Sequence, residues 1–427
     1  MRTLTVAAMA VLMLPRLALA GEAGDALVAH LCAGTAAEGY ATSREECFML
    51  NGEACFAQGL INVIMAYEGL AQDLYRYGAT TPGTPAAAML LGMGMSSENA
   101  PANPDPEPLT YAALRTVLMD FVVELDQSRV AFEAAGRLED YVIKIDPLRV
   151  RIDFDGDGQA GEGETLSALL AAAGEFTDIP APDNPPPGGK VKNKTPATSD
   201  SSVGFDPADA IWFAGYTQIV AAPVDLLLAH DFSGFYDVYL HRVFPKSDLP
   251  MQDYSRGGVL FSDAESDSSI ADIIAAIHAL DFPVSDPGRL AGVLERLKAI
   301  TALSRENWEL ILSETDDDRE LVPSPSQTSI FPGMAVTEET VAEWMATFDR
   351  VDEILAGELL VPHWRFAQGF DLKTYFETAQ ETDLVLLFTG SAALPYLKDG
   401  PVADAQSFAE ANRVFGQDWL NYVFWFN

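Results

Sequence analysis

The sequence predicts a mainly α-helical globular protein of two helical parts, and three observations point to it. Three long segments, 55–76, 110–135 and 208–230, carry apolar residues at helical spacing. The chain of 427 residues has neither an internal repeat nor a heptad seam, which are the patterns of solenoids and coiled coils. Residues 177–203 are rich in Pro and Gly and can bury almost nothing. We expect this stretch to be a disordered linker or insertion between the two parts.

The amino terminus has the pattern of a secretory signal peptide. Arg2 gives a basic start, residues 4–14 are apolar, and Ala18-Leu19-Ala20 forms a small-x-small cleavage site. We therefore expect residues 1–20 to be removed after Ala20, which leaves a periplasmic or secreted protein. No later segment has eighteen uninterrupted apolar residues, so no membrane span is expected.

Charge limits the classes of partner. The chain holds 63 acidic and 26 basic residues, a formal net charge of −37. Such a charge repels phosphate backbones and anionic lipid, so no nucleic-acid partner is expected. A protein or saccharide partner stays open.

Three cysteines, Cys32, Cys47 and Cys55, lie near the start of the first helical part. An exported chain is expected to oxidise one pair. Both Cys47 with Cys55 and Cys32 with Cys47 fit the spacing. No C-x-x-C motif supports zinc binding or redox chemistry.

The most specific motif is the acidic stretch 153–164, DFDGDGQAGEGE. Calcium takes about seven oxygen ligands at roughly 2.3–2.6 Å, and alternating acids along a tight loop can supply them from one side. A glycine at Gly158 permits the turn around the ion, and a water is expected at Gly161, which has no side-chain oxygen. The ligands that this spacing predicts are the carboxylates of four acids and one backbone carbonyl: Asp153, Asp155, Asp157, Glu164 and, through its carbonyl, Gln159.

These twelve residues and the helix expected at 165–173 resemble the calcium loop of the EF-hand family. The β-branched segments before the loop, with Pro147 between them, predict an extended entry instead of the family's entering helix. Ala160 stands where a larger aliphatic residue usually pairs with a second loop. The resemblance therefore implies an unpaired site whose calcium is structural, at the end of a first helical part that spans 21–176.

A possible partner loop begins at Asp263 and has acids at its first, third and fifth positions. It lacks the turn glycine, and Ile274 stands where the closing Glu belongs. We favour the alternative that Asp267 or Ser268 caps a helix over 270–280.

The second helical part spans 204–427. Asp206 is a predicted cap for the helix over 208–230, with Pro207 in its first turn. The apolar segment 384–388 fits either a buried strand or a helical turn. Further helices are expected at 270–280, 287–303, 305–313 and 337–356.

No established catalytic motif is present: G-x-S-x-G, H-E-x-x-H and a phosphate-binding glycine loop are all missing. His230 and His241 could form an acid/base pair or a metal site if one helix joined them, although polar ends of core helices explain them better. The cluster His363-Trp364-Arg365 could bind an anionic or sugar ligand through stacking and an Arg fork, but structural packing is favoured there too.

Four sequence blocks, together with the calcium loop, are similar to a group of exported bacterial proteins of unknown function. The resemblance covers most of the chain and implies no activity and no catalytic residues. The blocks are WFAGY at 212–216, LLLAHDF at 226–232, LVPHWR at 360–365 and the ending WFN at 425–427.

Two hypotheses follow. The favoured one is a calcium-binding exported protein of unknown biochemical activity, with neither a deep polar pocket nor a strongly shifted pKa away from the loop. The alternative is an extracytoplasmic hydrolase of a polymeric substrate, stabilised by calcium. It requires a cleft lined by two convergent carboxylates or by His230, His241, Trp364 and Arg365.

Overall fold

The computed structural model describes residues 21–80, 103–138, 141–153, 156, 160–167, 201–250, 264–315, 317, 319–328, 336–416, 422, 425 and 426. The expected signal peptide, most of the expected linker, loop residues Asp155, Asp157 and Gln159, and residues 168–173 of the expected exiting helix lie outside these ranges. Within them the protein is mainly α-helical, as predicted.

Helices of the first part form where caps and apolar periodicity coincide. The Asn51 side chain accepts from the Ala54 amide at 3.0 Å and starts α3, and the Thr110 hydroxyl accepts from the Ala113 amide at 3.1 Å and starts α5. The first two helices were not predicted, and α2 has few apolar residues to reveal its period. The described helices of this part are α1 (Glu22–Ala33), α2 (Ala36–Phe48), α3 (Gly52–Arg76) and α5 (Tyr111–Ala135).

Helix α7 opens the second part with the predicted Asp206 cap. The Asp206 carboxylate accepts from the amides of Ala208 and Asp209, and the Asp209 carboxylate accepts from the Asp206 amide. The described helices of this part are α7 (Pro207–Leu228), α8 (Ser233–Tyr239), α9 (Ala264–His278), α10 (Pro287–Ile311), α11 (Glu338–Ala356), α12 (Leu372–Thr378), α13 (Leu384–Thr389) and α14 (Ala409–Phe415).

Strands are short and occur in antiparallel pairs. The segment before the calcium loop is extended, as predicted, and pairs with the segment before α7. The described pairs are β1 (Ile143–Ile145) with β2 (Val203–Phe205), β3 (Asp281–Pro283) with β5 (Glu381–Asp383), and β4 (Gly369–Phe370) with β6 (Leu397–Lys398). The 3-10 turns are η1 (Pro147–Arg149), η2 (Glu162–Glu164), η3 (Leu240–Arg242) and η4 (Ser391–Tyr396).

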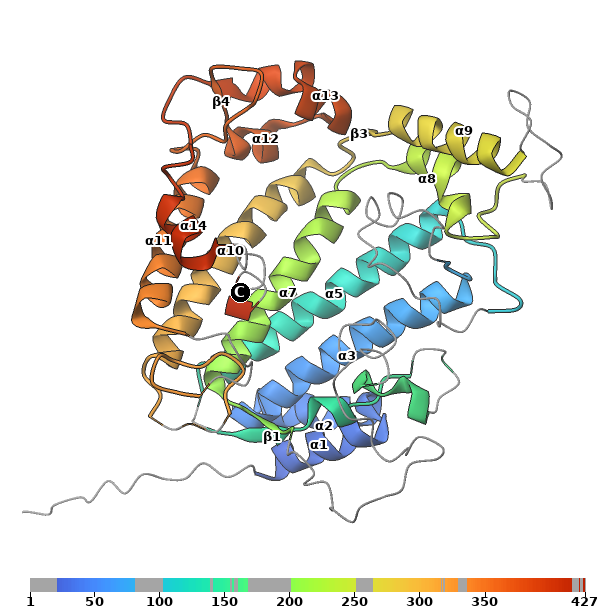
Figure 1. Cartoon of the computed structure of the whole chain (residues 1–427). Helices are drawn as coiled ribbons and strands as arrows, with labels where there is room; N and C mark the ends of the chain where they lie inside the picture. The colour runs from blue at the N-terminus through green and yellow to red at the C-terminus, as the bar shows by residue number, and fades with distance from the viewer. Residues whose placement is uncertain are drawn as a thin grey trace, which may run out of the picture.

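The two helical parts share one hydrophobic core. Figure 1 shows α3, α5, α7 and α10 as a row of long helices, in which α5 packs against α3 and α7, and α7 packs against α10. Phe56 of α3 and Phe132 of α5 meet Phe205 and Phe213 of the second part, and the rings of Phe132 and Phe213 stack at 5.1 Å. The stretch expected to be a linker therefore does not separate two independent cores.

Two helix boundaries differ from the prediction. Helix α9 begins at Ala264, so Asp267 and Ser268 lie inside the helix instead of capping it, and the segment of the weak second loop is helical. Acids in the first turns of a helix suit the positive end of its dipole. Helix α10 is continuous where two helices, 287–303 and 305–313, were expected. Polar residues alone do not stop it, because no Gly or Pro occurs between Val293 and Ile311.

The apolar segment 384–388 forms most of α13 and is not a buried strand. The Asp383 side chain caps this helix by accepting from the Leu386 amide at 2.7 Å. Its Phe388 side chain is 71% exposed.

A disulfide joins Cys47 at the end of α2 to Cys55 in α3, with a Cα–Cα distance of 4.4 Å. This is one of the two pairings that the spacing allowed. Cys32 carries a free, half-buried thiol.

Helices α3 and α7 are long and apolar enough to cross a membrane by length and composition alone. Both lie in the helix row, with half of their apolar windows buried inside the protein. Core helices of soluble proteins have the same character.

Candidate metal centres

Backbone hydrogen bonds join the two ends of the predicted calcium loop. The Ile152 amide donates to the Glu164 carbonyl at 3.0 Å, and the Leu166 amide donates to the Val150 carbonyl at 2.9 Å. This antiparallel pairing places the first position of the loop, Asp153, beside its last, Glu164. A chelating loop requires that closure, because its first and last ligands must reach the same ion.

The described carboxylates of the loop turn inward along it. Asp153 Oδ1 accepts from the Gly156 amide at 2.9 Å, and Glu164 Oε2 accepts from the Gly161 amide at 2.6 Å. Gly156 has a φ of 72°, in the left-handed region that favours glycine. Glu164 thus reaches back to the residue that precedes its own 3-10 turn.

Helix α3 supplies two polar contacts to the loop that sequence reasoning missed. Glu68 Oε1 accepts from the Asp153 amide at 3.1 Å, and Gln72 Nε2 donates to the Asp153 carbonyl at 2.8 Å. Burial raises the pKa of Glu68, the hydrogen bond from the Asp153 amide opposes this, and repulsion from Asp153 and Glu164 adds to it. Glu68 and Gln72 stand four residues apart, so they lie on one face of α3, and this spacing was the available sequence signal.

The loop also packs on the end of α1. The Arg151 amide donates to the Leu31 carbonyl at 3.0 Å, and Arg151 Nη1 donates to the Ala160 carbonyl at 3.0 Å. Gly34 ends α1 with a φ of 70°, and a Cβ there would lie 2.3 Å from the Ala160 Cβ. The loop therefore rests between α1 and α3, and glycine is required at its closest approach.

A second acidic cluster lies at the start of α7. One ligand oxygen from each of Asp206, Glu314 and Glu320 lies within 4.8 Å of the others. Glu320 is 5% exposed. Gln327 Nε2 donates a hydrogen bond to Glu314 Oε2 at 2.9 Å. Asp209 lies beside the cluster, also 5% exposed. Sequence reasoning predicted only the capping role of Asp206.

One buried carboxyl at this cluster has a strongly raised pKa. Burial, followed by repulsion from Asp206, Glu320 and Glu314, raises the pKa of Asp209 well above its ordinary value. The favoured hypothesis predicted no strongly shifted pKa away from the loop 153–164, so the raised pKa of Asp209 departs from it.

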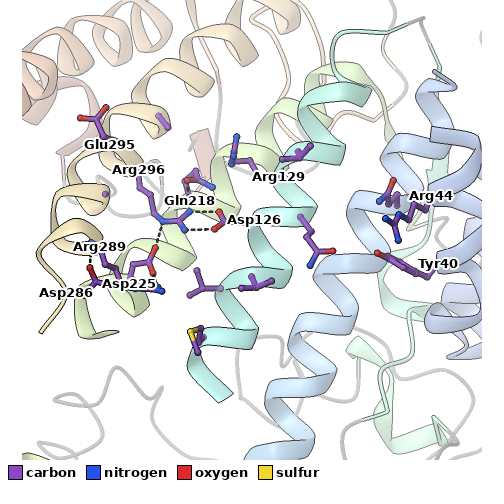
Figure 2. Close-up of a pocket in the computed structure, with 18 residues that line it drawn as sticks. Tyr40, Arg44, Asp126, Arg129, Gln218, Asp225, Asp286, Arg289, Glu295 and Arg296 are labelled. Carbon is purple, nitrogen blue, oxygen red and sulfur yellow. Dashed lines mark hydrogen bonds and ion pairs between the residues drawn. The ribbon is translucent and has the colours of Figure 1, made fainter. Parts of the chain in front are cut away.

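A groove of about 1080 Å³ crosses the helix row (Figure 2). Arg296 of α10 binds both oxygens of Asp126 at 2.7 Å and donates to Asp225 at 2.5 Å. Arg289 also pairs with Asp225. The groove's convergent carboxylates are therefore engaged by arginines, whereas a hydrolase needs them free to act on a substrate.

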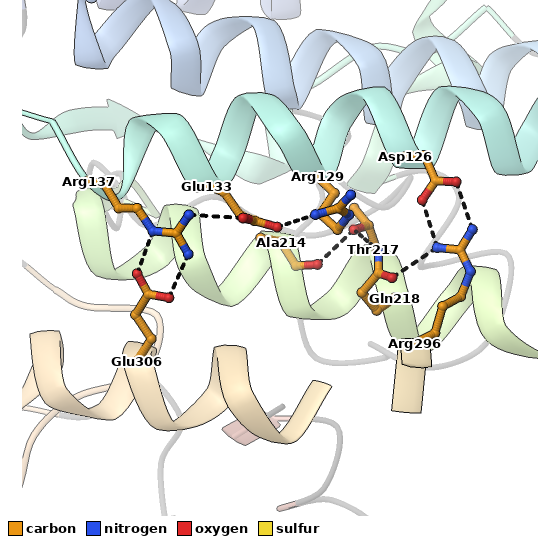
Figure 3. A network of polar contacts seen from close by, with 9 residues as sticks. All are labelled: Asp126, Arg129, Glu133, Arg137, Ala214, Thr217, Gln218, Arg296 and Glu306. Carbon is orange, nitrogen blue, oxygen red and sulfur yellow. Dashed lines mark hydrogen bonds and ion pairs between the residues drawn. The ribbon is translucent and has the colours of Figure 1, made fainter. Parts of the chain in front are cut away.

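The groove's polar wall continues as a network along α5 (Figure 3). Glu133 pairs with Arg129 and Arg137, and Arg137 binds both oxygens of Glu306 on α10 at 2.8 Å. These pairs link α5 to α10 across α7. Their arrangement is that of a structural brace between helices.

His230 and His241 do not meet. His230 is buried, and its two ring nitrogens contact the Leu226 carbonyl and the Thr382 hydroxyl, each at 2.7 Å. His241 Nε2 lies 3.3 Å from Asp272. They lie in separate packing environments, as the favoured interpretation expected.

The cluster His363-Trp364-Arg365 is a surface feature. Trp364 is 73% exposed, its indole donates to the Phe388 carbonyl at 2.7 Å, and the Arg365 guanidinium lies 4.5 Å from its ring centroid. None of these three residues, and neither histidine above, lines the groove. The residues proposed for a hydrolase are thus not brought together.

Comparison with known proteins adds no relative: no family model, no curated protein and no solved structure matches the chain.

Proposed function

We propose that this chain is an exported calcium-binding protein, whose ion sits in the loop 153–164 and fastens the loop to α1 and α3. One observation carries the proposal. The clasped ends of the loop bring Asp153 and Glu164 together, and Glu68 adds a third carboxylate close enough to feel both charges. Asp155, Asp157 and the Gln159 carbonyl complete the proposed ligand set from the sequence pattern.

A structural role for the ion is supported by how the loop is held. Its first residue is bound from α3 through Glu68 and Gln72, and its eighth, Ala160, gives its carbonyl to Arg151. These contacts tie the loop to its own chain, whereas a sensor loop must be able to rearrange with a partner loop. Carboxylates gathered this closely repel one another, and calcium removes that repulsion.

Export supports calcium as the ion. The expected signal peptide would place the protein where calcium is abundant, so a site of modest affinity would stay filled. No contact described above favours a hydrolase.

The test is calcium titration of the chelator-stripped protein by calorimetry, with unfolding followed in parallel. We expect wild-type protein to bind calcium and to melt at a higher temperature with it. Glu164→Gln keeps the size of the side chain but weakens its metal ligation, so it should lose the calcium binding and the stabilisation that the loop provides. Asp105→Asn, at a carboxylate whose side chain is 94% exposed, is the matched control and should behave as wild type.

Two results would overturn the proposal. One is a melting temperature that calcium does not change in the wild-type protein. The other is equal calcium binding by the wild-type and Glu164→Gln proteins.

A further inference from the structure

The acidic cluster at the start of α7 is assembled from distant parts of the chain. Asp206 comes from the cap of α7, whereas Glu314 and Glu320 come from the segment after α10. Their ligand oxygens lie within 4.8 Å of one another, a separation at which three oxygens can contact one cation. Bringing three acids this close costs repulsion that the fold must offset.

The backbone around the cluster fixes its geometry. Asp206 Oδ1 accepts from the Ala208 amide at 2.7 Å, so its carboxylate is oriented by the first turn of the helix. Gln327 orients Glu314 through a hydrogen bond of 2.9 Å. Two of the three carboxylates are therefore positioned by neighbours, as metal ligands generally are.

An independent observation comes from Tyr141. Its side chain is 3% exposed, and its hydroxyl has no hydrogen-bond partner among the described residues. The β1–β2 register pairs Ile143 with Phe205, which brings the segment just before β1 close to the start of α7. Burial, followed by the nearby charges of Asp206, Asp209 and Glu53, raises the pKa of this hydroxyl. A buried hydroxyl without a partner costs about 1–3 kcal/mol, and a hydrated cation or its ligand would satisfy it.

We propose that Asp206, Glu314 and Glu320 form a second site for a hard divalent cation, with Tyr141 supporting it from the buried side. The ligand set contains only oxygen, which suits calcium or magnesium and disfavours metals that prefer nitrogen or sulfur. The site is separate from the loop 153–164 in sequence and in its supporting helices. Its ion would fasten the segment after α10 to the cap of α7 and thereby hold the second part of the protein together.

The competing explanation is that the protein offsets the repulsion without an ion, through the cluster's own polar contacts and through protons shared with Asp209. Both explanations offset the repulsion, but only the cation makes the cluster sensitive to chelation. Counting bound ions therefore separates the two.

The experiment is native mass spectrometry of the chelator-stripped protein after addition of calcium alone or magnesium alone. We expect wild-type protein to bind two calcium ions. Glu320→Gln and Glu314→Gln should each bind one, and so should Glu164→Gln, which affects the loop only. Adding Glu164→Gln to Glu320→Gln should leave none. Retention of the second ion in magnesium alone would identify the cluster as a magnesium site.

Tyr141→Phe keeps the ring packing and gives a milder test if the glutamate variants fail to fold. It should weaken binding of the second ion by about 10- to 100-fold, the usual effect of removing a supporting contact. The proposal is overturned if Glu320→Gln, Glu314→Gln and Tyr141→Phe all bind as many ions, and as tightly, as wild type. Failure of the loop site would show separately, as an ion count that Glu164→Gln does not change.

Discussion

The two ends of helix α7 bury carboxylates in opposite surroundings. Near its carboxyl end, Asp225 is 5% exposed and is held by Arg289 and Arg296. At its amino end, Asp209 is equally buried but faces other acids. The acid at the carboxyl end is held by arginines that brace the fold, whereas the acids at the amino end are where we propose that a cation binds.

Removing an arginine partner of Asp225 should change the stability of the protein the most. Arg296→Met should lower the free energy of unfolding by about 3–5 kcal/mol, because Asp225 would keep its buried charge with less compensation. Denaturant unfolding measures it. Arg305→Met is the matched control: Arg305 also lies on α10 and pairs with two acids, but these are exposed, so its loss should cost at most about 1 kcal/mol. An equal loss of unfolding free energy in the two variants would contradict the claim that the buried pairs of Arg296 stabilise the fold more than the exposed pairs of Arg305.

Removing calcium with a chelator should lower the stability of the acidic cluster at the start of α7 and of the loop 153–164. It should not affect the ion pairs of Asp225 near the end of α7. At a calcium concentration a hundredfold above the dissociation constant, each site should contribute about 2.7 kcal/mol of stability. Melting with calcium and with chelator measures this contribution. Arg296→Met should lose the same amount on chelation as wild type, and a chelator effect that disappears in this variant would show that the two ends are not independent.

Substitution of Glu68 tests whether α3 contributes to calcium binding by the loop. Glu68→Gln should weaken calcium binding by about 10- to 100-fold, because it removes a charge that supports the first ligand from outside the loop. Calorimetric titration measures the change. Gln72→Ala removes the neighbouring hydrogen bond to the Asp153 carbonyl without removing a charge, so a smaller loss is expected. A larger loss for Gln72→Ala would mean that orientation of the loop matters more than the charge of Glu68.

The smallest effect concerns pH at the carboxyl end of α7. Burial lowers the pKa of His230 below its ordinary 6.5, partly opposed by its hydrogen bond to Leu226. The unfolded chain therefore takes up a proton first as the pH falls, so stability is full above about pH 6.5 and declines below it. Urea unfolding between pH 7.5 and 5.5 should show this contribution as a difference between wild type and His230→Gln that grows as the pH falls. The difference between wild type and His278→Gln, whose residue is exposed, should stay nearly constant over the same range.

The sequence predicted best those features whose determinants are local. The Asp206-Pro207 start of α7 and the Thr110 start of α5 follow from caps next to apolar periodicity. The calcium loop could be proposed from the sequence because its expected ligands are contiguous, and calcium binding there stays a prediction. The error at α10 has a local cause too, since the polar residues around Ser304 looked like a break but contained no helix breaker.

What could not be predicted depends on contacts between distant segments. Glu314 and Glu320 belong to a segment whose path is set by the end of α10, and nothing near them in sequence indicates Asp206 as a neighbour. Glu68 was hidden for the same reason, because its helix meets the loop only in the folded protein. The exposed position of Phe388 likewise depends on the place of α13 in the fold, because the sequence of 384–388 fitted a buried strand and a helical turn equally well.

The most direct test of calcium in the loop is an anomalous-difference map from crystals grown with calcium, or with a lanthanide in its place. The proposal predicts a peak within about 2.3–2.6 Å of oxygens of Asp153 and Glu164. A map in which these carboxylates carry no peak, from protein that is otherwise folded as described, would contradict it.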